Sequence, residues 1–185
     1  MIRSTFLKIL GYTLIVLCTY TGHSQDRNIP DSLLHNLERD NTGVLIADSG
    51  NVIILNELAS HYRYIEMDSL FKYVQLSLPM AEEVGFTKGF FDGKYLLGVY
   101  HFSRGEYEEV FEHATSALEN PAITDYPERR ASLNQLVGTS YAAQGNYQMG
   151  LNYFLKALEL YNRLGEEADR FKTLNIFKKD IVKGT

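Results

Sequence analysis

The sequence has a single cysteine, Cys18, and it lies within the first 24 residues. The rest of the chain therefore lacks disulfides, thiolate metal sites and thiol catalysis. Basic runs are also missing, because Lys and Arg form nothing longer than the pairs Arg129-Arg130 and Lys178-Lys179, and the net charge is -5. Such a chain has no electrostatic attraction for phosphate backbones, so nucleic acid is not expected as a partner.

Long apolar runs are scarce as well. The run from Ile9 to Cys18 is about ten residues, whereas a membrane-spanning helix needs roughly 20. Arg3 and Lys8 precede or open it, and small residues up to Ser24 follow it. This order predicts a signal peptide cleaved near Ser24, with a membrane anchor as the rival interpretation. The expected mature protein is exported, periplasmic or secreted, and has no membrane span.

Motifs for catalysis or metal binding are missing too. "GFFDGKY", from Gly89 to Tyr95, has three residues between its two glycines, whereas a phosphate-binding loop has four. Tyr95 also stands where such a loop has Ser or Thr. The histidines beyond residue 24 show no spacing of three or four residues; they are His35, His61, His101 and His113. The sequence therefore predicts a protein that is not an enzyme, with no catalytic residue, metal ligand or cofactor.

What the sequence does contain is an internal repeat. "LGVYHFSRGEYEEVFEHATSALEN", residues 97–120, aligns with "VGTSYAAQGNYQMGLNYFLKALEL", residues 137–160, at an offset of forty with six identities. Helical apolar spacing on both sides of the central glycine predicts a helix, a tight turn and a second helix in each copy. We expect Gly105 and Gly145 to end the first helices in a left-handed conformation.

Two other glycines have a packing role in this interpretation. Gly138 on the first helix and Gly150 on the second lack side chains where two antiparallel helices would cross, and Tyr141 and Phe154 would fill the space beside them. Such a hairpin buries one side of each helix only, so it needs a neighbour.

The repeat resembles the tetratricopeptide repeat (TPR), whose pattern is Leu-Gly, Tyr, Ala, Phe, Ala and a closing Pro. The later copy carries the resemblance in this order: Val137-Gly138, Tyr141, Gly150, Phe154 and Ala157. The earlier copy keeps Leu97-Gly98, Ala117 and Pro121, and a degenerate first copy keeps Leu58-Ala59 and Tyr62. Asn134 stands where the family often has Trp. The forty-residue spacing is similar to that of exported N-terminal sensor regions of Bacteroidetes-type signalling proteins.

The resemblance implies an all-α fold, a TPR-like α-solenoid of stacked antiparallel helix hairpins. The expected organisation is a signal peptide at 1–24, an N-terminal helix and linker at 25–50 and TPR-like repeats at 51–185, divided into 51–88, 91–124, 131–164 and a partial repeat or capping helix at 166–183. The implied function is a non-catalytic protein-protein interaction module, either free-standing or the sensor part of a truncated signalling protein.

The resemblance also places a protein or peptide partner in a concave groove lined by the first helix of each repeat. Counting from each Leu-Gly position gives the groove candidates Asn56, Ser60, Arg63, Tyr64, Asp92, Tyr95, Val99, Phe102, Gln135, Thr139 and Ala142. Val99 and Ala142 could instead touch neighbouring helices. Self-association through Phe171, Leu174 and Phe177 is a further hypothesis. The alternative function, suggested only by the 13 tyrosines, is a small ligand-binding protein or hydrolase with a site between helices.

Overall fold

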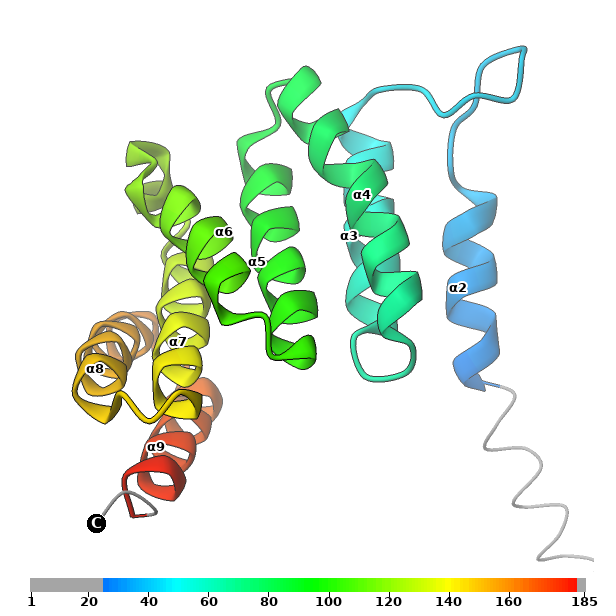
Figure 1. Ribbon diagram of the computed structural model, residues 1–185. Coiled ribbons are helices and arrows are strands. Elements are labelled where there is room, and N and C mark those ends of the chain that lie inside the picture. The colour runs from blue at the N-terminus through cyan, green and yellow to red at the C-terminus, as the bar shows by residue number, and fades with distance from the viewer. Residues whose placement is uncertain (1–24, 183–185) are drawn as a thin grey trace, which may run out of the picture.

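The computed structural model describes residues 25–182, and that part of the chain is all-helical, as expected (Figure 1). Its elements are α2 (Gln25–His35), α3 (Ser49–Tyr62), α4 (Met67–Glu83), α5 (Thr87–Arg104), α6 (Tyr107–Glu119), the 3-10 helix η1 (Pro121–Asp125), α7 (Pro127–Ala143), α8 (Tyr147–Leu164) and α9 (Glu167–Val182). The predicted signal peptide, residues 1–24, lies outside the described residues.

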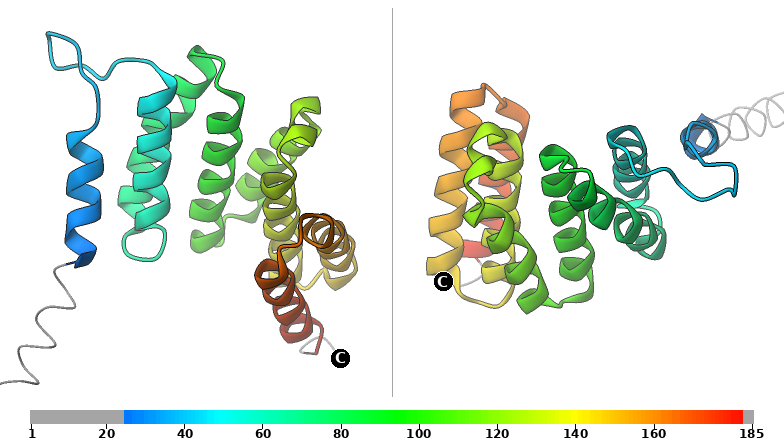
Figure 2. Two further views of the ribbon diagram at one scale, coloured as in Figure 1. Left: turned by 180° about the vertical axis from the view of Figure 1, so that it is seen from behind. Right: turned by 90° about the horizontal axis from the view of Figure 1, so that it is seen from above.

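The helices pack against their neighbours along the chain. α3 and α4, α5 and α6, and α7 and α8 form contacting pairs, and each pair also contacts the helix that follows it. In addition, α3 contacts α5, α5 contacts α7, and α7 contacts α9. The odd-numbered helices α3 to α9 therefore form a row of mutual contacts, which the two views of Figure 2 let the reader follow from behind and from above.

The turns inside the second and third pairs are built as the repeat predicts. Gly105 and Gly145 have φ angles of 75° and 81°, the left-handed region that glycine adopts without steric cost. After them, the Glu106 N–H donates to the His101 carbonyl at 3.0 Å and the Asn146 N–H to the Tyr141 carbonyl at 2.9 Å. These bonds satisfy carbonyls at the helix ends, so each glycine stops one helix and lets the chain reverse.

The crossing of α7 and α8 is also as predicted. A Cβ atom on Gly138 would lie 3.1 Å from the Gly150 carbonyl oxygen, and one on Gly150 would lie 3.0 Å from the Gly138 oxygen. Phe154 is 1% exposed and packs against the same spot. The two backbones approach closely because neither glycine carries a side chain.

The second pair differs from its neighbours in the length of its second helix. α6 has 13 residues, whereas α4 has 17 and α8 has 18. The α-helix ends before Pro121, which lacks a backbone N–H, and the Asn120 side chain instead accepts from the Ala122 N–H at 3.0 Å to start η1. α7 then begins at Pro127, a residue suited to the first helical position.

A buried amide attaches the segment between α2 and α3. Asn51 is 1% exposed, and its Nδ2 donates to the carbonyls of Glu38 and Ile46, each at 2.8 Å. Its Oδ1 accepts from the Glu38 N–H at 2.9 Å. These three hydrogen bonds satisfy the buried Asn51 amide. They hold this loop to the start of α3. Leu37 joins the first apolar core beside it.

Two apolar cores fill most of the interior. The first includes Leu55, Leu70 and Val74 and lies among α3, α4 and α5. The second includes Phe91, Ala114 and Val137 and lies among α5, α6 and α7. Within residues 25–182, no helix combines the length and the apolar character that crossing a membrane requires.

Gly89→Ala is expected to destabilise the fold. A Cβ there would collide with Val52 Cγ1 and lie 2.6 Å from Phe86 Cδ1, and overpacking of this kind costs about 1–3 kcal/mol. Gly93→Ala on the same helix is the control, since the closest atom to its Cβ would be the flexible end of Leu78 at 3.1 Å, and its other neighbours would lie at ordinary contact distance, 3.5 Å or more. Urea unfolding measures both free energies. Equal stability of the two variants would contradict a tight α3–α5 contact.

Candidate functional site

A surface hollow whose lining residues are joined by hydrogen bonds and ion pairs lies where α3, α5 and α7 meet. A hollow of about 220 Å³ is lined by side chains of all three helices and by Phe86, which precedes α5. We call it the α3–α5–α7 hollow. It occupies the row of odd-numbered helices, so its shape depends on how successive helix pairs are stacked.

The base of this hollow is a buried polar contact. Asn56 on α3 is 6% exposed, and its Nδ2 donates to the Gly89 carbonyl on α5 at 3.0 Å. Its Oδ1 accepts from the Ser77 hydroxyl on α4 at 2.7 Å. Because buried polar groups cost several kcal/mol without partners, this geometry fixes three helices relative to one another. Asn56 therefore positions the hollow, and both its Nδ2 and its Oδ1 already have a hydrogen-bond partner.

Tyr95 on α5 is held between two arginines. Its hydroxyl accepts a hydrogen bond from Arg63 Nη1 at 3.2 Å. The Arg129 guanidinium carbon lies 4.4 Å from the centre of the Tyr95 ring, within the range of a cation–π interaction. One arginine comes from the end of α3 and the other from the first turn of α7, so Tyr95 links the first and third pairs through the second.

Asp92 orders the cations around that ring. Its Oδ1 accepts from Arg129 Nε at 2.8 Å and lies 2.6 Å from Arg129 Nη2, while its Oδ2 accepts from Lys88 Nζ at 2.8 Å. The side chains of Arg129 and Asp92 are only 27% and 16% exposed, so solvent weakens their pairing less than that of an exposed pair. Both carboxylate oxygens are thus used within the site.

The charge of the hollow differs from that of the whole chain. Its lining holds Arg63, Lys88 and Arg129 against Asp92 and Glu57, an excess of one positive charge, although the chain carries -5. In addition, Arg63 Nε is buried and has no hydrogen-bond partner among the described residues. A buried donor without a partner favours a ligand that brings an acceptor.

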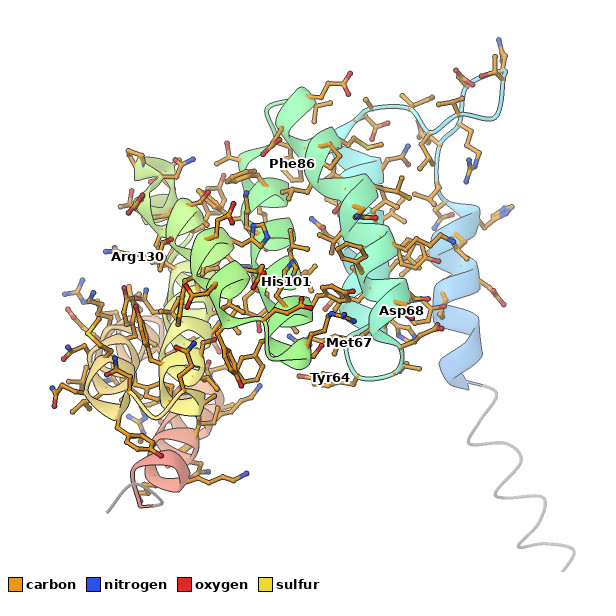
Figure 3. The ribbon with its side chains drawn as sticks, in the orientation of Figure 1. Tyr64, Met67, Asp68, Phe86, His101 and Arg130 are labelled. Carbon is orange, nitrogen blue, oxygen red and sulfur yellow. The ribbon has the colours of Figure 1, made fainter. Side chains whose placement is uncertain are left out.

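Five of the predicted groove residues meet in this hollow: Asn56, Ser60, Arg63, Asp92 and Tyr95. Ser60 is exposed there. Tyr64 is 76% exposed at the tip of the α3–α4 hairpin, where the Arg63 guanidinium lies 4.5 Å from its ring centre (Figure 3).

The other predicted residues lie elsewhere. Val99 packs on the first apolar core, and Phe102 contacts the Tyr107 ring at 5.9 Å. Gln135 accepts from the Tyr161 hydroxyl at 3.2 Å, and Thr139 donates to the Gln135 carbonyl at 2.8 Å. Ala142 is buried against Gly150, between α7 and α8. Burial raises the pKa of Tyr161 to about 12, so that hydroxyl stays protonated and can donate.

Sequence reasoning missed Arg129, Lys88 and Ile53, which also line the hollow. Counting groove positions from each Leu-Gly pair passed over the first turn of each helix, where Lys88 and Arg129 stand. Pro127 was the available clue, because a proline at the first helical position would have put Arg129 inside α7.

The fold also joins two histidines that the sequence keeps twelve residues apart. The rings of His101 on α5 and His113 on α6 have centroids 5.3 Å apart, and His101 Nδ1 lies 2.8 Å from Glu106 Oε2. Figure 3 labels His101 on α5. Within the described part of the chain, no group of three or more His, Cys, Asp or Glu side chains is arranged to hold a metal ion.

The residues of the last helix that were considered for self-association are only partly described. Phe171 is 55% exposed and Leu174 is partly buried. The Phe177 side chain lies outside the described residues.

No protein-family model, no curated protein and no solved structure matches this chain. The likeness to the tetratricopeptide repeat therefore stands on the residues quoted above.

Stability is expected to fall as the pH drops below about 6.5, the ordinary pKa of histidine. Burial, aided by Lys94 and by His101, lowers the pKa of His113, while Glu112 and Glu109 oppose that shift. The unfolded chain then binds the proton first, so protonation favours unfolding. His113→Gln should flatten this decline in urea unfolding measured from about pH 7 to pH 5. His35→Gln, an exposed site on α2, is the control, and an unchanged slope in His113→Gln would refute the assignment.

Proposed function

We propose that this chain is a TPR-like α-solenoid that acts as a protein-protein interaction module. The observation that carries the proposal is the row of contacts among α3, α5, α7 and α9, with the α3–α5–α7 hollow on it. Stacked helix pairs of this kind expose an extended surface made by one helix of each pair. A segment of another protein lying along the row would contact several pairs at once.

The side chains of the hollow suit an extended segment with an acidic residue. Arg63 and Arg129 flank Tyr95, and arginine with an aromatic ring is the combination most enriched at the energetic centres of interfaces. The free Arg63 Nε can donate to a carboxylate or a backbone carbonyl. Ile53, which is 43% exposed beside them, offers an apolar contact.

We further propose that the protein works outside the cytoplasm, as a free-standing adaptor or as the sensing part of a signalling protein. The charged, apolar and small-residue regions of residues 1–24 support export. The lack of cysteine in the remaining chain is compatible with an oxidising compartment.

A photo-crosslinking residue at Ser60, which is exposed in the hollow, should capture one defined partner. The same residue at Ser116, exposed on α6, is the matched control and should not. Purified partner should then bind Arg63→Glu at least about tenfold more weakly, since a lost charge-assisted bond costs about 1.5–3 kcal/mol. Equal capture from both positions would reject the hollow as the binding surface.

Export makes a separate prediction about the N-terminus. Protein recovered from the producing cell should begin at or near Gln25, because cleavage is expected near Ser24. Intact mass and N-terminal sequencing measure this directly. Recovery of a chain that retains residues 1–24 would refute cleavage and favour the anchor interpretation.

A further inference from the structure

A second hollow lies among α6, α7 and α8, and its lining shares no residue with the first. Its volume is about 320 Å³, within the range typical of small-molecule sites. We call it the α6–α8 pocket. Its lining includes Leu118 and Glu119 at the end of α6 and five residues of α8 between Tyr153 and Arg163.

The pocket has room at its base because of Asn134. This residue stands where the resembled repeat often has Trp, and it is 4% exposed among the lining residues. Its Nδ2 donates to the Arg130 carbonyl of its own helix at 2.7 Å. A larger side chain at this position would occupy the space that the pocket now offers.

Apolar surface covers two sides of the pocket. Leu118 of α6 and Leu160 of α8 line it together with the ring of Tyr153. Tyr153 is fixed from behind, because its ring stacks on Tyr141 at 5.7 Å. Burial raises the pKa of Tyr153, and electrostatic interaction with Tyr141 and Glu119 raises it further.

The charged side chains around the pocket are of both signs, and most of them have no ion-pair partner among the described residues. Glu159 and Arg163 pair with each other at 2.6 Å. Within residues 25–182, the side chains of Glu119, Arg130 and Lys156 form no ion pair or hydrogen bond. Lys156 Nζ lies over the Tyr153 ring, 4.6 Å from its centre. Arg130 is labelled in Figure 3. One carboxylate and two cations without an ion-pair partner thus line the pocket beside its apolar side chains.

We propose that the α6–α8 pocket binds a small zwitterion with an apolar side chain, such as a free apolar amino acid. Arg130 and Lys156 receive its carboxylate, Glu119 receives its ammonium group, and Leu118 and Leu160 receive the side chain. Glu119, Arg130 and Lys156 are exposed and therefore solvated in the unbound protein. A ligand carrying both charges pairs with all three groups at once, whereas an anion or a cation alone pairs with groups of one sign only.

Three probes that differ in one charge each test this assignment on the full chain. They are L-phenylalanine, N-acetyl-L-phenylalanine, which lacks the ammonium charge, and L-phenylalaninamide, which lacks the carboxylate. Binding is followed by chemical-shift changes of backbone amides in the pocket. L-phenylalanine should bind at least about tenfold more tightly than either blocked form, because each loses charge-assisted hydrogen bonds.

Variants then assign each charge to its residue. Glu119→Gln should remove the preference for L-phenylalanine over the N-acetyl form, and Arg130→Gln should weaken the preference over the amide. Glu83→Gln, a glutamate at the end of α4, is the matched control and should change neither. Asn134→Trp, the larger residue of the resembled repeat, should fill the base and abolish binding while the thermal unfolding midpoint is retained.

Several results would overturn the proposal. Equal binding of the three probes, a preference that survives Glu119→Gln, or binding that survives Asn134→Trp in a folded protein would each do so. Shifts confined to Ser60 and Asp92 would place the ligand in the α3–α5–α7 hollow instead. Because the partner test uses Ser60 and Arg63 on the other hollow, either proposal can fail while the other stands.

Discussion

The close approach of helix backbones is the constraint on which the rest of the structure depends. At Gly138 and Gly150 the backbones of α7 and α8 meet, and at Gly89 the backbone of α5 comes against Val52 of α3. The second contact brings the Gly89 carbonyl within reach of Asn56, whose amide also holds Ser77. A methyl group at Gly89 would separate α3 from α5 and so disturb the arginines that flank Tyr95.

The two hollows use charge in different ways. In the α3–α5–α7 hollow most charges already have a partner, since Asp92 pairs with Arg129 and Lys88, the Tyr95 hydroxyl accepts from Arg63, and the Tyr95 ring contacts Arg129. Such a surface is preorganised, which lowers the conformational entropy lost on binding. In the α6–α8 pocket the charges of Glu119, Arg130 and Lys156 remain for a ligand to use. The first hollow suits a macromolecular surface and the second a small, doubly charged molecule.

The sequence was sufficient for the local structure and insufficient for the assembled sites. Gly105 and Gly145 could be placed because a left-handed turn favours one residue type, and the Gly138–Gly150 crossing could be placed because both copies of the repeat keep helical spacing. The pairing of Arg129 with Asp92 spans 37 positions, and the His101–His113 contact joins two helices. The first contact depends on how pairs stack and the second on how the two helices of one pair are rotated against each other, and helical spacing encodes neither. Asn134 departs from the repeat pattern in sequence, but the pocket beside it also requires the end of α6 and the residues of α8.

The pattern of contacts has a consequence for how the chain folds. Substantial contacts join helices that are neighbours or next neighbours along the sequence, such as α7 with α8 and α5 with α7. Little chain must therefore be closed into a loop before any contact forms, and a low contact order of this kind goes with folding in microseconds to milliseconds. Folding can begin in any helix pair and spread to the pairs beside it.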